Sequence, residues 1–307
     1  MFLREKRPHV GIVVEYNPFH NGHIYQIEQI KKMFPNCKIT VAMSYKYSQR
    51  GEIIIAPWRV RKKYAKKYGV DKFVKLHTDI SAQAAHIFAS EAVLKLAKKS
   101  INYLVFGSET NDVDLFLKIA NLIKNNSDQY NLLIKKYLKQ KGNSFPRATN
   151  LALSELSGSN ITMPNDILGL EYVKTIVNHN LDITPISILR TIDFHSEETN
   201  NQFASASKIR SMLVNGEDIS PFTPIPRYKM TSKNISDTYK KFQKIVINTQ
   251  KEKLAKMKMI TEGMENLFKK NIHLETYEEF VEACVSKRYT RSRIKRAYLF
   301  VLLKKYK

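Results

Sequence analysis

The sequence predicts an α/β fold, in which a Rossmann-like parallel sheet is followed by a C-terminal helical domain. Short apolar runs rich in β-branched residues, typical of strands buried on both faces, recur up to residue 189. Helical patterns separate these runs, as the connections between parallel strands require. After the proline-containing segment 221–226, Gly and Pro become rare and the pattern stays helical. We therefore expect two domains, residues 1–220 and residues 221–307.

Five apolar runs are expected to form the strands of the sheet: residues 10–14, 38–43, 71–76, 103–106 and 183–189. Helices are expected over residues 24–34, 58–68, 112–141 with a break at 125–128, 145–156, and from residue 164 onward. Ser81 is expected to cap a further helix that runs to Lys99, in which His86 has a structural role. Asn165 or Asp166 is expected to cap the helix that follows Pro164.

The composition indicates a globular protein that stays inside the cell. The chain has 307 residues, of which 43% are hydrophobic, enough for a real core. It contains no apolar run of membrane-spanning length, and its first residues lack the apolar stretch of a signal peptide. Cys37 and Cys284, the two cysteines, are expected to be reduced core residues rather than a bridge. We therefore expect a cytoplasmic protein that does not enter a membrane.

The formal net charge of +23 favours a polyanionic partner such as a nucleic acid. Lysine scattered over solvated faces is the alternative explanation. From residue 225 to the end, 21 Lys or Arg stand against 8 Asp or Glu. Residues 287–307 contain nine basic side chains and no acidic one. Such a surface suits a phosphate backbone, although a terminal helix with a solvated basic face would have the same composition.

Residues 10–26 read as a buried strand, a turn, an H-x-G-H string and a helix, an arrangement that suits a nucleotide phosphate. The helix start offers unpaired N–H groups, and Gly22 lets the backbone come close to a phosphate. His20 and His23 share one side of this start and can donate hydrogen bonds to phosphate oxygens in the transition state. Half of a metal site is the alternative, but no third ligand lies nearby at metal spacing.

Further candidate residues follow the later strands. Gly107 and Arg190 come at strand carboxyl ends, where ligands bind in open α/β sheets. Gly107 would admit an adenosine or serve an ordinary turn, and Arg190 would grip a phosphate or carboxylate or form a surface ion pair. Ser205, Ser207 and Arg210 surround another predicted helix start and together form a second anion cradle.

The string V-V-E-Y-N-P-F-H-N-G-H, residues 13–23, resembles the H-x-G-H nucleotidylyltransferase superfamily and, more closely, the tRNA(Met) cytidine acetate ligase family. The strings F-G-S-E at 106–109, P-N-D-I-L-G-L-E-Y at 164–172 and T-R-S-R-I-K-R at 290–296 resemble the same family, as does the pattern S-x-x-x-x-Q-R-G-E at 44–52. The chain departs from the family pattern at Tyr45, Lys46, Tyr47, Ala56 and Pro57. The resemblance thus extends over nearly the whole chain.

The resemblance implies an ATP-dependent ligase with a nucleotidylyltransferase-like catalytic domain and a basic, tRNA-binding helical domain. Acetate would be activated to acetyl-adenylate, and the acetyl group would pass to N4 of the wobble cytidine of elongator tRNA(Met), giving N4-acetylcytidine. A Mg²⁺ ion is expected to accompany the ATP, without an evident protein ligand set. No protein partner is evident from the sequence.

The resemblance also assigns roles to residues. His20 and His23 would be catalytic. The ATP-binding residues would be Val13, Val14, Glu15, Tyr16, Asn17, Pro18, Phe19, His20, Asn21, Gly22, His23, Ile24, Tyr25, Gln26, Gly107, Asn165, Arg190, Ser205, Ser207 and Arg210. The tRNA-binding residues would be Arg288, Arg291, Arg293, Lys295 and Arg296. Independently of the resemblance, Tyr289, which lies between Arg288 and Arg291 in the sequence, could stack on an unpaired base.

Two other functions fit the same residues. An adenylyltransferase acting on a small phosphate-ester cofactor precursor would use the same H-x-G-H site, but it would not need the basic C-terminal domain. A non-catalytic tRNA-binding protein would keep the fold without the chemistry, and the intact His20, Gly22, His23 and Arg210 argue against it.

Overall fold

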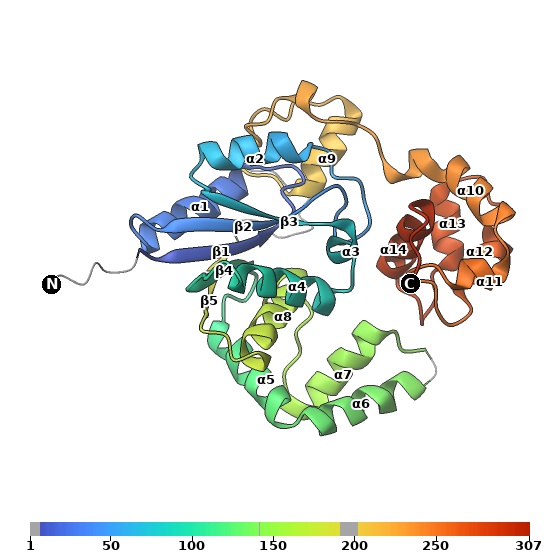
Figure 1. The fold of residues 1–307 in the computed structure, drawn as a ribbon, viewed down its shortest axis with the longest axis horizontal. Helices are drawn as coiled ribbons and strands as arrows, with labels where there is room; N and C mark the ends of the chain where they lie inside the picture. Colours follow the sequence, from blue (N-terminus) through green and yellow to red (C-terminus); the bar gives the residue numbers. More distant parts are fainter. Residues whose placement is uncertain (1–6, 141, 191–201) are drawn as a thin grey trace.

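The computed structural model describes residues 7–140, 142–190 and 202–307 and is centred on a five-stranded parallel sheet (Figure 1). The strand order is β3-β2-β1-β4-β5. The strands are β1 (His9–Val14), β2 (Lys38–Ser44), β3 (Lys72–Leu76), β4 (Tyr103–Ser108) and β5 (Thr184–Leu189). Each begins and ends within two residues of the run predicted for it, and all pairings are parallel. The predicted α/β fold class is confirmed.

Strand β1 is the centre of the sheet because it pairs on both sides. Val10 lies opposite Ile39 of β2 and opposite Tyr103 of β4. From β1 the chain proceeds outward to β2 and β3, and then returns to the other side of β1 for β4 and β5. The direction of strand addition therefore reverses between β1 and β4. In open α/β sheets the carboxyl ends of the strands at such a reversal enclose the ligand crevice.

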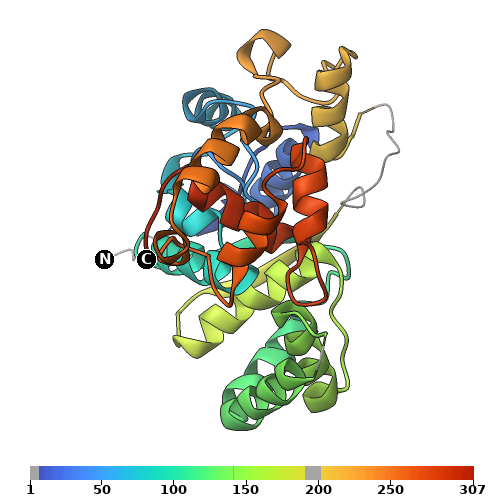
Figure 2. The same cartoon turned by 90° about the vertical axis from the view of Figure 1, so that its right-hand side faces the viewer.

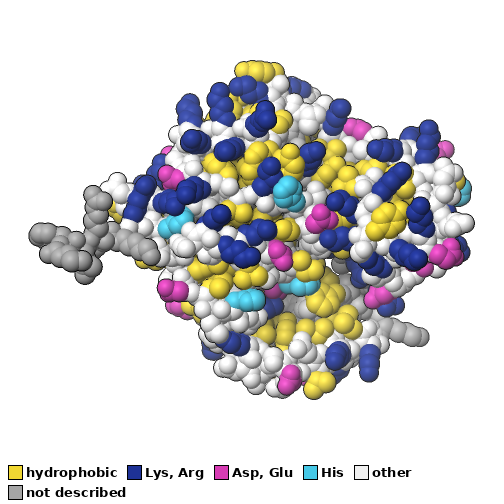
Figure 3. Space-filling model, in the orientation of Figure 1, with side chains coloured by type: hydrophobic (Ala, Val, Ile, Leu, Met, Phe, Trp, Pro, Cys, Tyr) yellow, Lys and Arg dark blue, Asp and Glu magenta, His cyan; other side chains and the backbone are white. Residues whose placement is uncertain are grey.

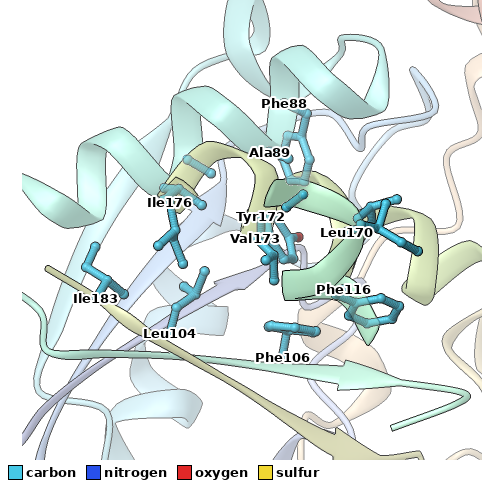
Figure 4. Close-up of a cluster of buried hydrophobic side chains, with 14 of the residues drawn as sticks. Phe88, Ala89, Leu104, Phe106, Phe116, Leu170, Tyr172, Val173, Ile176 and Ile183 are labelled. Atoms are coloured by element: carbon cyan, nitrogen blue, oxygen red, sulfur yellow. The ribbon is translucent and has the colours of Figure 1, made fainter. Parts of the chain in front are cut away.

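Helices cover both faces of the sheet (Figure 1). Helices α1 (Asn21–Met33) and α2 (Trp58–Lys67) pack on one face, and α4 (Ala85–Ala97), α5 (Val113–Asn125) and α8 (Pro164–Asn178) pack on the other. Figure 4 shows the second face, where Phe106 of β4 lies among Phe116 and Tyr172. Gly169 of α8 makes room for this ring, since a Cβ there would lie 2.6 Å from Phe106 Cε2. The helix interior glycine thus lets α8 approach the sheet closely.

Helices α6 (Ser127–Lys139) and α7 (Phe145–Ser157) form a hairpin that projects away from the sheet, at the bottom of Figure 1. The predicted break before α6 is confirmed, since α5 ends at Asn125 and α6 begins at Ser127. Lys136 and Glu155 join the two helices through an ion pair of 3.1 Å.

The predicted helix capped by Ser81 is wrong. Residues Thr78–Ser81 form a separate short helix, α3, in which Ser81 is buried, and α4 begins only at Ala85. Residues 82–84, between the two helices, form hydrogen bonds that the helical periodicity of the sequence does not predict. Gln49 Nε2 donates to the backbone oxygen of Gln83 at 2.6 Å, and Gln83 Nε2 donates back to the backbone oxygen of Asp79. These tertiary contacts separate the two helices.

The C-terminal helices pack around a core of their own, on the right of Figure 1 and in front of the sheet in Figure 2. They are η2 (Ile235–Thr238), α10 (Tyr239–Asn248), α11 (Lys251–Ala255), α12 (Met264–Asn271), α13 (Tyr277–Cys284) and α14 (Arg291–Leu302). The short helix η1 (Arg227–Lys229) lies outside this core, and Arg227 donates to the backbone oxygen of Leu213 in the α/β part. Helix α14 is central, and the rings of Phe242 and Tyr298 stack with centroids 4.0 Å apart. Asp79 of α3 contacts Lys258 and Lys305, each at 3.4 Å, and so joins these helices to the α/β part.

The segment that precedes these helices packs against the start of α1. Asn21 N donates to the backbone oxygen of Phe222 at 2.9 Å, and Thr223 Oγ1 donates to the backbone oxygen of Phe19 at 2.6 Å. Cys37 and Cys284 are both free and buried, as the sequence predicts. In the part of the chain that the structure describes, no helix combines the length and apolar composition needed to cross a membrane.

Candidate active site

A cavity of about 810 Å³ opens at the carboxyl ends of β1 and β4. It brings together most of the residues that the sequence singles out, from segments far apart in the chain. Its walls include Val13, Val14, Glu15, Tyr16, Asn17, His20, Gly22, His23, Tyr25, Gln26, Gly107, Asn165, Arg190, Ser205, Ser207, Arg210 and Arg296. The cavity wall, as far as the described residues form it, does not include four other predicted ATP-binding residues: Pro18, Phe19, Asn21 and Ile24. The predicted tRNA contacts Arg288, Arg291, Arg293 and Lys295 also lie outside it.

The two histidines form a reciprocal cap at the start of α1. His20 Nδ1 accepts from Gly22 N at 3.1 Å, and His23 Nδ1 accepts from His20 N at 3.2 Å. Because each Nδ1 accepts a hydrogen bond, each neutral ring carries its proton on Nε2. The ring centroids are 3.8 Å apart, so the two donors lie side by side at the cavity wall.

Burial keeps both rings neutral. Burial first, and then the nearby Arg190 and Arg210, lower the pKa of His20 to about 3. The pKa of His23 also lies well below its ordinary value, through burial and then through His20 and Arg190. Near pH 7 the pair therefore presents two neutral N–H donors, and the positive charge of the site comes from arginine.

Aromatic packing fixes the orientation of His23. The ring of Tyr16 meets it edge-on at a centroid distance of 4.6 Å, and the ring of Phe19 stacks on it at 5.8 Å. Tyr16 and Phe19 are almost fully buried. Phe19, one of the predicted ATP-binding residues, thus packs against the ring of His23.

The second predicted anion cradle, formed by Ser205, Ser207 and Arg210, is hydrogen-bonded to the turn that precedes the histidine pair. Ser205 caps α9 (Ala206–Asn215) by accepting from Lys208 N at 3.1 Å. Arg210 Nη1 donates to the backbone oxygen of Asn17 at 2.8 Å, and Nη2 donates to Ser207 Oγ at 3.1 Å. The guanidinium therefore lies beside the turn that leads into the histidine pair.

Arg190 and Gly107 lie together at the ends of β5 and β4. Arg190 N donates to the backbone oxygen of Ser108 at 3.1 Å, which continues the sheet pairing beyond β5. A Cβ on Gly107 would be 3.3 Å from Arg190 Cγ, so the missing side chain leaves room for the arginine. Both residues line the cavity.

The predicted cap of α8 by Asn165 or Asp166 is wrong, because Glu109 caps this helix from the end of β4. The Glu109 carboxylate accepts from Asn165 N at 3.1 Å and from Asp166 N at 3.0 Å. Asp166 is buried and reaches back, accepting from Ser108 Oγ and from Glu109 N. With Pro164 already inside the helix, Asn165 and Asp166 lie in its first turn, too late to serve as the cap.

A model of the HIGH Nucleotidyl Transferase family matches residues 8–307. The chain is 54% identical to the tRNA(Met) cytidine acetate ligase of Mycoplasmopsis synoviae, over 98% of this chain and 99% of that protein. It is 35% identical to the tRNA(Met) cytidine acetate ligase of Anoxybacillus flavithermus, over 95% of this chain and 77% of that protein. The chain belongs to the tRNA(Met) cytidine acetate ligase family.

Solved structures agree with this family membership. The apo structure of Thermotoga maritima TmcAL matches 98% of this chain and 76% of that chain, with a TM-score of 0.89 and 28% sequence identity. The structure of TmcAL bound with alpha-thio ATP matches with a TM-score of 0.87 and 27% identity.

The chain's departures from the ligase family pattern lie away from the cavity. As far as the described residues form its wall, that wall contains none of Tyr45, Lys46, Tyr47, Ala56 and Pro57. Tyr45 instead packs against the single tryptophan, Trp58, at a centroid distance of 5.9 Å. Lys75 Nζ lies 4.4 Å from the Tyr45 ring centroid.

Arg61 is a structural residue of the site that sequence reasoning missed. The sequence predicts only a basic amphipathic helix around it, but the side chain is fully buried. Its guanidinium donates to the backbone oxygens of Glu15 at 2.7 Å, Ser44 at 2.8 Å and Tyr45 at 2.5 Å. It thus holds the carboxyl ends of β1 and β2 together. Its spacing of four residues from the buried Ala65 is the one signal for an inward orientation.

The loop at the end of β2 supplies two further carboxylate contacts. Glu15 Oε1 accepts from Gln49 N at 2.6 Å, and burial raises the pKa of Glu15. Glu52 lies 3.1 Å from Lys295 Nζ and 3.9 Å from Arg210 Nη2. The loop therefore connects the cavity to the C-terminal helices.

The basic residues of the C-terminal part differ in their surroundings. Arg288 pairs with Glu262 at 3.1 Å, Arg291 pairs with Glu282, and Arg293 lies 3.7 Å from Glu262. Arg296 is buried.

The expected stacking of Tyr289 on a base is wrong in this structure. The side chain is buried, and its hydroxyl donates to the backbone oxygen of Glu262 at 2.7 Å. The Arg293 guanidinium covers its ring at 5.0 Å. Since the ring packs inside the C-terminal helices, Tyr289 supports the arginines around it.

Proposed function

We propose that the protein activates acetate with ATP and transfers the acetyl group to N4 of the wobble cytidine of elongator tRNA(Met). The observation that carries this proposal is the pair of neutral Nε2–H donors on His20 and His23, whose rings lie 3.8 Å apart and share one cavity with Arg190 and Arg210. Family membership supports the same reaction, because the ligases named above carry it in their names.

In the first step an acetate oxygen attacks the α-phosphorus of ATP, and the bond from this phosphorus to the pyrophosphate oxygen breaks. Negative charge shifts onto the phosphate oxygens as this happens. His20 and His23 would donate to these oxygens as neutral groups, already oriented by their Nδ1 hydrogen bonds. The products are acetyl-adenylate and pyrophosphate.

Arginine would hold the charged groups in place. Arg210, with Ser207 and the start of α9, would bind the β- and γ-phosphates. Arg190, across the cavity, would bind the α-phosphate or the acetate carboxylate, both of which match its planar fork. Mg²⁺ would enter with the ATP, held by phosphate oxygens and water. Among the described residues no group of three or more His, Cys, Asp and Glu forms a metal cluster.

In the second step the N4 amine of cytidine attacks the acetyl carbonyl carbon. The amide bond forms, the bond to the adenylate oxygen breaks, the amine gives up a proton, and AMP leaves. The target base must leave its stack to reach the cavity. We propose that residues 221–307 bind the tRNA and that residues 1–220 carry the chemistry. Figure 3 shows Lys and Arg side chains spread over one face of both parts.

The test is release of pyrophosphate from ATP, measured with and without acetate and with and without elongator tRNA(Met). The expected result is release that depends on acetate, with labelled acetate recovered on the tRNA as N4-acetylcytidine. Release that ignores acetate and requires a phosphate-ester acceptor would instead identify an adenylyltransferase. tRNA binding without any pyrophosphate release would identify a non-catalytic RNA-binding protein.

A further inference from the structure

Arg296 is a buried cation that faces the active-site cavity from the C-terminal helices. Its side chain is 7% exposed and forms part of the cavity wall. Within residues 7–140, 142–190 and 202–307 its guanidinium has no hydrogen bond and no ion pair, and its Nε is buried without a partner. The other four predicted tRNA contacts, Arg288, Arg291, Arg293 and Lys295, each have an acidic partner.

An isolated buried charge is unfavourable, because burial removes water and nothing replaces it. Burial, and then the nearby Arg293, lower the pKa of Arg296 to about 10, so the group is still charged near pH 7. A buried, unpaired guanidinium in a cavity wall is therefore suited to an anionic ligand. Its planar fork is the donor geometry that matches a phosphate.

The carboxylates of the cavity wall do not supply that anion. They are Glu15, Glu52 and Glu171, and among the described residues none of them forms an ion pair with Arg296. Glu52 pairs with Lys295 at 3.1 Å, and Glu171 Oε1 is paired with Lys174 Nζ at 2.9 Å. His86 lines the same wall, and burial lowers its pKa.

The start of α14 adds further donors beside Arg296. Thr290 caps this helix of 12 residues by accepting from Arg293 N at 3.3 Å, and Ser292 stands one turn before Arg296. Thr290 and Ser292 line the same cavity. The helix start therefore presents its free N–H groups and a hydroxyl on the side where the buried guanidinium lies.

The backbone of Arg296 is seated against the loop at the end of β2. Gly51 is buried and has φ of +84°, and a Cβ there would lie 3.0 Å from the backbone oxygen of Lys295 and 3.3 Å from Arg296 Cα. This close approach fixes α14 relative to the cavity. The position of the Arg296 backbone at the cavity is thus set by the fold.

We propose that Arg296, with Ser292 and the start of α14, binds an RNA backbone phosphate next to the target cytidine, inside the cavity. This inference rests on the proposed function. A base that leaves its stack to enter the cavity brings its flanking phosphates with it. The α/β part already offers Arg190 and Arg210 to the phosphates of ATP, whereas Arg296 comes from the C-terminal part, where 21 Lys or Arg stand against 8 Asp or Glu.

The first test is Arg296→Met, which keeps the length of the side chain and removes the charge. We expect the Kd for tRNA to rise roughly ten- to a hundredfold, as for loss of a charge-assisted hydrogen bond. Acetate-dependent exchange of pyrophosphate into ATP should be unchanged. The Tm should not fall, because an unpaired buried charge has been replaced by an apolar group. The matched control is Arg59→Met, an exposed arginine of α2 that is not a predicted tRNA contact, where the Kd should change less than about threefold.

The second test removes the charge from the RNA instead. Two anticodon stem-loops are made, each with an uncharged methylphosphonate in place of one of the two phosphates that flank the wobble cytidine. Their Kd values for the wild-type protein and for Arg296→Met are measured without ATP or acetate. We expect one of the two replacements to raise the Kd of the wild-type protein about as much as Arg296→Met does, and to leave the Kd of Arg296→Met unchanged. This readout requires no catalysis, so it decides the inference even if the proposed reaction fails.

Three results would overturn the inference. Additive losses from the methylphosphonate and from Arg296→Met would mean that the two groups do not meet. A raised KM for ATP in the exchange reaction, with tRNA affinity kept, would assign Arg296 to a nucleotide phosphate. Unchanged RNA and ATP binding together with a lowered Tm would make the residue purely structural.

Discussion

Glu52 accepts a hydrogen bond from Lys295 Nζ at 3.1 Å, and this contact joins the loop after β2 to the helix α14 of the C-terminal part. The other carboxylate oxygen lies 3.9 Å from Arg210 Nη2, at the second anion cradle. One side chain therefore contacts both the proposed phosphate site and the proposed tRNA-binding helix. Its removal should affect stability and tRNA use together.

Glu52→Gln should lower the free energy of unfolding at pH 7 by about 1 kcal/mol, since half-buried ion pairs of this kind contribute little more. Burial raises the pKa of Glu52, but Lys295 and Arg210 outweigh it and hold the pKa below its ordinary value. A lowered pKa means that the stabilisation exists above the unfolded pKa, near 4.3, and is lost as pH falls through the folded value. Urea unfolding of both proteins from pH 7 to pH 3 measures this. A difference that persists at pH 3 would contradict the ion-pair explanation.

His23→Ala should reduce acetate-dependent pyrophosphate exchange roughly 10²- to 10³-fold, because one donor to the reacting phosphate is lost. Binding of tRNA should be retained, since the C-terminal helices are untouched. His179→Ala, an exposed residue at the end of α8, is the control and should exchange at the wild-type rate. Wild-type turnover by His23→Ala would remove the histidine pair from the mechanism.

The pH dependence of kcat/KM for ATP should show no histidine ionisation between pH 5.5 and 8. This ratio reports the free protein, in which burial lowers the pKa of His20 to about 3 and that of His23 well below 6.5. Both rings therefore stay neutral throughout this range and keep their Nε2–H donors. Initial rates of exchange across the range check this. A rise with an apparent pKa near 6.5, beyond the ionisation of ATP itself, would show that one ring is charged in the free protein.

Arg61→Met should destabilise the protein by roughly 3 kcal/mol, because the backbone oxygens of Glu15, Ser44, Tyr45 and Ala56 lose their donor. Arg61→Lys should recover little, since an ammonium cannot reach all four carbonyls that the guanidinium contacts. Thermal unfolding measures both. Arg59→Met, exposed on the same helix, is the matched control and should change stability by less than about 0.5 kcal/mol. Equal Tm values for the Arg59 and Arg61 variants would refute the proposed role.

The sheet and the H-x-G-H helix are predictable from sequence because both depend on local signals. A parallel strand buried on both faces must be apolar throughout, and Val10, Ile12 and Val14 satisfy this without reference to any other segment. His20 and His23 are predictable because three-residue spacing at a helix start places both on one side.

The residues that sequence reasoning missed or misplaced have roles set by partners distant in the chain. Glu109 caps a helix that begins 55 residues later, at Pro164. The sequence suggests that Tyr289 is an exposed aromatic residue in a basic stretch, but its hydroxyl donates a hydrogen bond to the backbone oxygen of Glu262. Arg61 reads as one more cation on a basic helix. Composition and periodicity carry no information on such long-range partners.

The hydrogen bond from Arg210 to Asn17 spans 193 residues, and Thr223 contacts Phe19 across 204. These contacts have a consequence for synthesis on the ribosome, where residues emerge in chain order. The first strand and its histidines leave the exit tunnel long before Ser205, Arg210 and Thr223 exist to complete the site. A nascent chain shorter than about two thirds of the protein should therefore be unable to hold a nucleotide, and ligand binding should begin only late in translation.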